Sequence, residues 1–304
     1  ESAEYGDALT EAAVATNTGI SAGLRRTSCY VSVYALAGEG DETQTGAGYS
    51  VARSPEDLDV ARAADDAVER ATRMLGATKP PSARVAVVLD TRVTTTLLRV
   101  LSATLSGEAV LKGRSLFAHR VGEEVGVPGL TLVDDPTDPE AYGAAPYDAE
   151  GLACRRNVLV EDGVLRGFLY DTYAARRARV APTASAVRGG FKTTPGVGSR
   201  AFSLAPGDKT QEEIVAEVGE GLFVQSVSGV HSGVNPVSGD FSVGAEGLVI
   251  RGGALAEPVR EVTIASTLQR MLRDVVAVGG DLEWLPGGAA GVTLAVAGVS
   301  MSGA

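Results

Sequence analysis

The chain has 304 residues, of which 44% are hydrophobic and 21% are charged. This composition excludes a disordered protein, and the length allows two domains. The formal net charge of −11 argues against a nucleic-acid-binding surface, because phosphate recognition needs clustered Lys and Arg. No apolar run reaches the roughly 18 residues that a membrane-spanning helix needs.

Histidine and cysteine are scarce in this sequence. Only His119, His231, Cys29 and Cys154 occur, and none has a metal-ligand or catalytic partner at a recognisable spacing. Two cysteines at unrelated positions indicate reduced thiols and a cytoplasmic protein. Residues 1–5 lack the basic and apolar stretches of a signal peptide. We therefore expect the chemistry to come from carboxylates and hydroxyls, or from a partner.

Residues 1–78 are predicted to form a small α+β unit with two or three strands and one helix. Residues 29–36 alternate between two faces, which is typical of a half-buried strand, and residues 43–52 can pair with them across a Gly-rich turn. Ser54, followed by Pro55, is predicted to cap a helix that ends before Gly76.

Residues 79–84 contain two prolines and are predicted to be a linker to a larger β-rich domain at 85–304. Thr210 and Glu213 have the spacing of a capping box. The expected fold class is α+β, a small α/β unit followed by a β-rich domain with inserted helices. Its strands are predicted at 85–89, 130–133, 157–170 (a hairpin), 222–228, 241–250, 257–264 and 290–299, and its helices at 91–105, 171–178, 211–218 and 265–277.

Six short stretches in this chain carry a resemblance to a known family. In chain order they are Gly107–Ser115, Leu132–Pro136, Tyr147–Gly151, Val160–Gly167, Val234–Ser242 and Val262–Ala265. Together they resemble the TldD/PmbA family, also called modulator-of-gyrase proteins, and they are closer to the PmbA (TldE) branch. The resemblance covers the middle and C-terminal domains of that family.

The resemblance implies a cytoplasmic zinc peptidase that is a heterodimer of TldD and TldE subunits and processes leader or unfolded peptides. In the TldD subunit an HExxxH helix binds Zn²⁺ through its two histidines, and the glutamate takes a proton from the bound water. The matching positions here are Leu98, Arg99 and Ala103, which cannot ligate zinc. The resemblance thus implies the non-metal subunit, without a cofactor of its own, beside a zinc-binding TldD-like partner.

Four residues are candidates for acid–base catalysis, each with a structural alternative. His231 lies in a Gly-rich loop and is either a group that lines a cleft or a surface histidine. Asp134, which ends a strand, is a possible acid or base, although such residues more often cap a turn. Asp148 and Glu150 either face a substrate chamber or fix a loop. Separately, the arginines that follow Cys154 could lower the pKa of its thiol, although a structural cysteine is the commoner case.

Asn235, Ser238, Asp240 and Ser242 form the densest polar cluster of a Gly-rich segment. Because glycines allow close approach of another backbone, these residues are predicted to bind an extended peptide substrate at a sheet edge. The alternative is an ordinary turn around Gly239.

Three functions remain open from the sequence. The first is the non-metal subunit, which shapes a chamber and grips extended peptide. The second is a metal-independent amide hydrolase in peptide or natural-product maturation, although no GxSxG nucleophile motif is present. The third is a non-enzymatic binding or scaffold protein.

Overall fold

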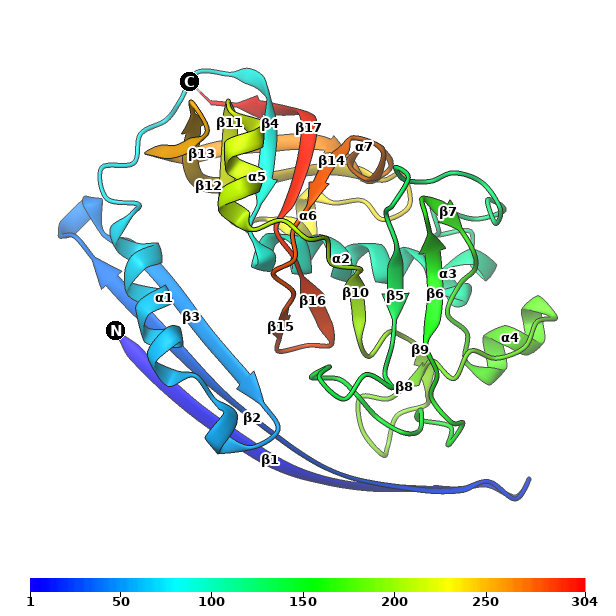
Figure 1. Ribbon diagram of the computed structural model, residues 1–304. Coiled ribbons are helices and arrows are strands. Elements are labelled where there is room, and N and C mark those ends of the chain that lie inside the picture. Colours follow the sequence, from blue (N-terminus) through cyan, green and yellow to red (C-terminus); the bar gives the residue numbers. More distant parts are fainter. Residues whose placement is uncertain (304) are drawn as a thin grey trace.

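The amino-terminal part of the chain is a three-stranded antiparallel sheet covered by one helix. A computed structural model describes residues 1–303. Strands β1 (Ser2–Ala15), β2 (Ser21–Ala37) and β3 (Gln44–Ala52) lie in the order β1-β2-β3. β1 and β2 pair over their whole length and extend past the end of β3 as a long ribbon that runs beneath the rest of the molecule (Figure 1).

Helix α1 (Val60–Thr72) packs on one face of this sheet through small residues. Ser54 is the N-cap residue of a short 3₁₀ helix and not, as predicted, of the longer helix, and its side chain makes no capping hydrogen bond. Residues Pro55–Asp57 form a short 3₁₀ turn, and α1 begins after Asp59, whose carboxylate accepts a hydrogen bond from the backbone N–H of Arg62 at 2.9 Å. An aspartate side chain at that position satisfies a free N–H of the first helical turn, so it outcompetes the earlier serine.

A larger sheet follows, and it closes on itself. It comprises β4 (Ala83–Leu89), β11 (Gly221–Ser228), β12 (Asp240–Arg251), β13 (Ala254–Thr267), β14 (Val275–Val278) and β17 (Leu294–Ser302). The strand order is β13-β12-β11-β4-β17-β14, and β13 also pairs with β17. Within this sheet β4 and β11 run parallel, and the other neighbouring strands are antiparallel.

A second sheet of short strands lies beside the closed one. Its order is β15-β16-β10-β5-β6-β7. The strands are β5 (Leu132–Asp134), β6 (Asn157–Glu161), β7 (Val164–Leu165), β10 (Phe202–Leu204), β15 (Glu283–Leu285) and β16 (Ala289–Gly291). Strands β8 (Ala186–Val187) and β9 (Gly196–Val197) form a separate small pair.

Helix α2 (Thr91–Thr104) lies between the two larger sheets and contacts β10, β11 and β16. Its leucines join the main hydrophobic core, which contains residues from both sheets. Burial of apolar side chains on both sides fixes the position of this helix in the fold. The remaining helices are α3 (Gly107–Leu111), α4 (Thr172–Ala178), α5 (Gln211–Val218), α6 (Val230–Gly233) and α7 (Leu268–Arg273).

The predicted α+β class is confirmed, and so is the capping box at the start of α5. Thr210 Oγ1 accepts from the N–H of Glu213 at 3.3 Å, and Glu213 Oε2 accepts from the N–H of Thr210 at 2.8 Å. The helix predicted at 265–277 is present but shorter, as α7 (Leu268–Arg273), because β13 continues to Thr267 and β14 begins at Val275. Within residues 1–303 no helix combines the length and the apolar character needed to cross a bilayer.

Candidate functional site

The three positions at which the resemblance expects a zinc motif lie on α2, between the two sheets. Leu98 is 2% exposed and belongs to the main core, whereas Arg99 and Ala103 are exposed. Arg99 donates a hydrogen bond to the carbonyl of Pro286 in the β15–β16 turn. Two hydrocarbon side chains and a guanidinium supply no zinc ligand, so these residues do not fit the metal.

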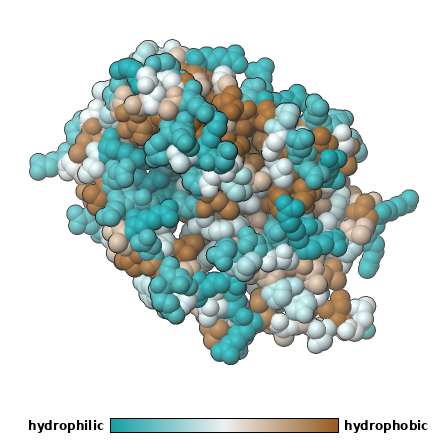
Figure 2. Space-filling view, viewed as in Figure 1, coloured by the Kyte–Doolittle hydropathy of each residue, from teal (hydrophilic) through white to brown (hydrophobic). Residues whose placement is uncertain are grey.

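The largest of the well-formed pockets in the described residues 1–303 lies between β3 and the carboxyl-terminal part of the chain, and has a volume of about 770 Å³. The last residues of β3 form one wall, and residues 139–142 and 282–284 form the other. Viewed as in Figure 1, the surface is hollowed between α1 and the rest of the molecule, and hydrophilic residues surround the hollow (Figure 2). Because β3 is the last strand of its sheet, the pocket adjoins an outer strand edge.

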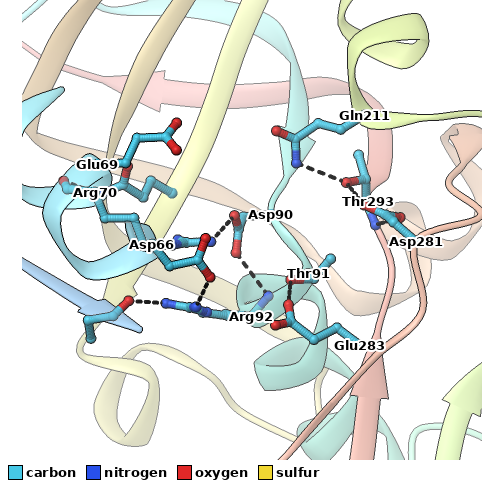
Figure 3. Close-up of polar contacts among 12 residues, drawn as sticks. Asp66, Glu69, Arg70, Asp90, Thr91, Arg92, Gln211, Asp281, Glu283 and Thr293 are labelled. Atoms are coloured by element: carbon cyan, nitrogen blue, oxygen red, sulfur yellow. Dashed lines mark hydrogen bonds and ion pairs between the residues drawn. The ribbon is translucent and has the colours of Figure 1, made fainter. Parts of the chain in front are cut away.

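A polar network joins α1, α2 and β15 beside this pocket (Figure 3). Asp90 caps α2 by accepting from the N–H of Arg92 at 3.0 Å, and its second oxygen accepts from Arg70 Nη2 at 2.6 Å. Arg92 Nη2 in turn lies 2.9 Å from Asp66 Oδ2 on α1. Both side chains of the Arg70–Asp90 pair are largely buried, so the pair holds α1 against the start of α2.

The pocket wall contributes further partners to this network. Glu283, which lines the pocket, accepts from Thr91 Oγ1 at 2.5 Å and from Arg62 Nη2 at 3.2 Å. The guanidinium of Arg92 lies 5.1 Å from the centre of the Tyr49 ring. Burial and a hydrogen bond shared with the Tyr34 hydroxyl raise the pKa of Tyr49 to about 12, so its hydroxyl stays protonated at neutral pH.

The carboxylates predicted as catalytic candidates, those of Asp134, Asp148 and Glu150, all accept hydrogen bonds from backbone N–H groups. One oxygen of Asp134 accepts from the N–H groups of Arg200 and Ala201 at 2.9 and 2.7 Å, and burial raises the pKa of this carboxyl. Asp148 accepts from three backbone N–H groups, and Glu150 accepts from both the N–H and the hydroxyl of Thr172. None of them lines the largest pocket, although Glu150 lines a smaller one of about 480 Å³ between the end of the β1–β2 ribbon and the carboxyl-terminal part of the molecule.

The predicted residues of the Gly-rich segment come together at the start of β12. Asn235 Oδ1 accepts from the N–H groups of Val237 and Ser238, and the Ser238 hydroxyl donates to Asp240 Oδ2 at 2.7 Å. Ser242 follows on β12 with an exposed side chain, and His231 lies in the neighbouring α6. These polar groups form a turn that bonds within itself, and they do not line the largest pocket.

Cys154 is not the activated thiol that its basic neighbours suggested. Burial raises the pKa of the Cys154 thiol to about 11, because a thiolate removed from water is disfavoured, and the lowering effect of Arg200 does not offset this. Arg155 turns away and donates to the carbonyl of Pro182. Within the described residues 1–303, no cluster of three or more His, Cys, Asp and Glu side chains is arranged to hold a metal ion.

Sequence reasoning missed the residues that line the pocket, among them Tyr49, Arg53, Tyr142 and Glu283. They come from three separate segments, and no spacing in the sequence links them. The alternation along β2 and β3 was the one available signal, since it places tyrosines and arginines on a common face.

The family of this chain is decided by two matches that together cover nearly all of it. A family model described as the PmbA/TldA metallopeptidase C-terminal domain matches residues 82–303, and one described as the central domain matches residues 2–75. The chain belongs to the PmbA/TldD family. This agrees with the resemblance that the short stretches carried.

Two relatives of this PmbA/TldD chain are named as metalloproteases. A metalloprotease of Methanothermobacter thermautotrophicus is 31% identical over 71% of this chain and 47% of the relative. Metalloprotease PmbA of Escherichia coli O157:H7 is 27% identical over 82% of this chain and 53% of the relative. The chain therefore spans about half the length of the curated relatives it matches.

Two solved structures share the fold. A putative modulator of DNA gyrase from Thermotoga maritima superposes with a TM-score of 0.92 at 27% identity, covering 99% of this chain and 68% of that one. TldE from Thermococcus kodakarensis superposes with a TM-score of 0.91 over 99% of this chain and 69% of that one. At 22% identity the second likeness concerns the fold alone.

Proposed function

We propose that this chain is the TldE-like subunit of a heterodimeric peptidase, and that a TldD-like partner supplies the zinc. The observation that carries this proposal is the identity of the residues on α2, where Leu98 is packed in the core and Arg99 is held by the β15–β16 turn. The metalloprotease names of the relatives support the peptidase class. Both cysteines are free, which suits a reducing cytoplasm.

We further propose that this subunit grips extended peptide along the outer edge of β3. That edge borders the largest pocket, whose opposite wall carries Tyr142 and Trp284. A strand edge offers backbone N–H and C=O groups to a peptide of any sequence, which suits a peptidase that acts on leader or unfolded peptides. The turn at Asn235, Ser238 and Asp240 is a second predicted contact, outside this pocket.

The alternative of a metal-independent amide hydrolase lacks a supporting contact. Its candidate carboxylates Asp134, Asp148 and Glu150 are each bonded to backbone N–H groups that hold local structure. Its fourth candidate, His231, lies in α6 and does not line the pocket beside β3. A scaffold role without any active partner is the third candidate. Co-expression separates all three.

The test is a peptidase assay on this chain, on an HExxxH-bearing TldD-like chain from the same genome, and on the two co-expressed. An unfolded peptide is the substrate, with and without a zinc chelator. We expect cleavage only by the complex, abolished by the chelator. Cleavage by this chain alone in chelator would establish the hydrolase instead, and a complex that neither forms nor cleaves would leave the scaffold role.

A further inference from the structure

Three arginines converge between the amino-terminal sheet and the carboxyl-terminal part without forming an ion pair in the described residues 1–303. They are Arg26 on β2, Arg53 just after β3, and Arg200 just before β10. We call them the arginine cluster. The fold brings them together from distant points of the chain.

The strand register places Arg26 and Arg53 on one face of the amino-terminal sheet. Tyr30 pairs with Val51, and residues two apart along a strand share a face. Arg26 lies four residues from Tyr30, and Arg53 lies two residues beyond Val51. This face also carries Tyr49, which the guanidinium of Arg92 on α2 covers, so it is turned towards the carboxyl-terminal part of the molecule.

The segment 141–144 brings Arg200 to the same place. Arg53 Nη2 lies 3.2 Å from the carbonyl of Ala141 and 3.3 Å from that of Ala144. A Cβ on Gly143 would lie 1.7 Å from the carbonyl oxygen of Arg200, so the two backbones are in direct contact. The pKa of Arg26 is lowered, first by burial and then by the charges of Arg53 and Arg200, as expected if the three cations are close.

The cluster holds donors that the protein leaves unused. The Nε atoms of Arg26 and Arg200 are buried and have no hydrogen-bond partner among residues 1–303. By contrast Arg25, on the opposite face of β2, pairs with Glu11 at 3.2 Å. Arg200 Nη2 and Arg53 Nη2 donate to backbone carbonyls, so the unused donors are the two Nε–H groups. A buried N–H group without a partner is costly in a folded protein, and an anion would supply the missing acceptor.

The cluster adjoins the pocket along β3. Arg53 and Tyr142 both line that pocket, together with the carboxylate of Glu140. The carboxylate of Asp134, which lies next to Arg200, is occupied at one oxygen by the backbone N–H groups of Arg200 and Ala201. Of the three arginines, Arg53 lines the pocket, and Arg26 and Arg200 lie behind it without an ion pair in the described residues.

We propose that Arg26, Arg53 and Arg200 bind a carboxylate of the peptide that lies in this pocket. The planar, multi-donor guanidinium matches a carboxylate better than a point charge does. The carboxylate is either the carboxyl terminus of the peptide or an acidic side chain. The identity of the ligand as a peptide rests on the proposed function, whereas the anion site itself does not.

The first experiment measures anisotropy of short rhodamine-labelled peptides of one length with this chain. One peptide has a free carboxyl terminus, one is amidated, one is amidated with an internal Glu, and one replaces that Glu by Gln. We expect a carboxylate to tighten binding by about tenfold over its neutral counterpart. Whichever carboxylate does so, terminal or side-chain, identifies the source.

The variant Arg26→Gln is expected to remove this preference, whereas the matched control Arg25→Gln keeps it. Arg25 is the preceding residue on the same strand, so both substitutions remove one charge from the same ribbon. Equal binding of charged and neutral peptides by the unmodified chain would overturn the proposal. An equal loss in the two variants would also overturn it, since it would show only a general effect of charge.

A second measurement is independent of peptide gripping. N-Acetylglycine and its neutral amide are titrated into labelled chain while the Nε–Hε signals of the arginines are followed by NMR. We expect N-acetylglycine, but not its amide, to shift arginine Nε–Hε signals. The shifted signals should be those that disappear in Arg26→Gln and in Arg200→Lys. If those signals shift but no peptide binds, the anion site stands and the peptide-gripping proposal fails; if they do not shift, the anion site is refuted.

Discussion

Asp90 combines two roles at a single residue. It caps α2 through one oxygen and accepts from Arg70 through the other, and its side chain is only 4% exposed. Asparagine preserves the cap but removes the charge, while alanine removes both. The residue therefore separates the contribution of the buried ion pair from that of the helix cap.

We expect Asp90→Asn to lower the free energy of unfolding by about 3 kcal/mol, because the buried Arg70 then loses its counter-charge. Asp90→Ala is expected to cost about 1 kcal/mol more through the lost cap. Urea unfolding followed by circular dichroism measures both. The control is Glu108→Gln, which breaks the exposed ion pair between Glu108 and Lys112 and should change the free energy of unfolding by under about 0.5 kcal/mol. An Asp90→Asn effect no larger than that control would contradict the assignment.

Cys154 offers a test of burial through pH. Its pKa of about 11 leaves far less thiolate at pH 8 than an unfolded cysteine has. We expect iodoacetamide to modify Cys154 much more slowly in the folded chain than in urea, as read by peptide mass spectrometry. Rapid modification at neutral pH in the folded chain would instead support activation by the neighbouring arginines.

The raised pKa of Cys154 also affects stability, with a defined sign. The folded state keeps the proton that an unfolded thiol loses near its ordinary pKa of 9.0, so stability is fully present below that pH and is lost as the pH rises towards 11. Between pH 9 and 11 the free energy of unfolding of the unmodified chain should therefore fall more steeply than that of Cys154→Ala, which lacks this thiol. Urea unfolding at a series of pH values compares the two chains, and identical pH profiles would contradict the raised pKa.

At the scale of elements, the packing of α1 against β3 depends on two glycines of that strand. A Cβ on Gly48 would lie 1.7 Å from the carbonyl oxygen of Ala63, and one on Gly46 would lie 2.0 Å from that of Ala67. The close approach lets the alanine face of α1 lie directly on the strand. The helix cannot keep this position if either glycine gains a side chain.

We expect Gly48→Ala to destabilise the protein by about 2–3 kcal/mol through overpacking. The matched control is Gly23→Ala in β2, where a Cβ meets nothing within 4 Å. That control should be neutral or slightly stabilising, because alanine restricts the unfolded chain. Thermal unfolding compares the two. Similar losses of stability in both variants would show that the change in strand propensity, and not the packing of α1, is the cause.

Elements with strong local signals were predictable from the sequence. The capping box of Thr210 and Glu213 and the apolar stripe of α2 are complete within a few turns, and both are observed. β1 was mostly missed because its side chains are small, polar and exposed, so no apolar alternation marks it. The helix predicted at 265–277 was drawn too long, because strand pairing continues through Thr267 and Val275 pairs with Val296, which leaves α7 at Leu268–Arg273.

The sequence predicted only one property of the candidate site, which is that the α2 positions carry no zinc ligand. Leu98, Arg99 and Ala103 are read directly from the chain, since the kinds of atoms they offer decide what they can ligate. The arginine cluster could not be found in that way, because Arg26, Arg53 and Arg200 meet only once the amino-terminal sheet packs against the segment 141–144. Burial of the Nε atoms of Arg26 and Arg200 is likewise a property of the packed molecule.

At the scale of the whole molecule, the amino-terminal sheet and the carboxyl-terminal part share the pocket and the polar network around Asp90 (Figure 3). The β1–β2 ribbon also reaches the far side, where Ile20 lies against Gly151. In the proposed complex this chain contributes a surface that holds peptide, while the partner contributes the metal.

The most direct test of this division is to count zinc in each polypeptide. The chain, its TldD-like partner and their complex are purified from zinc-supplemented medium and weighed by native and denaturing mass spectrometry. We predict no zinc retained by this chain alone and one zinc per heterodimer, carried by the partner. One equivalent of zinc held by this chain by itself would contradict the account.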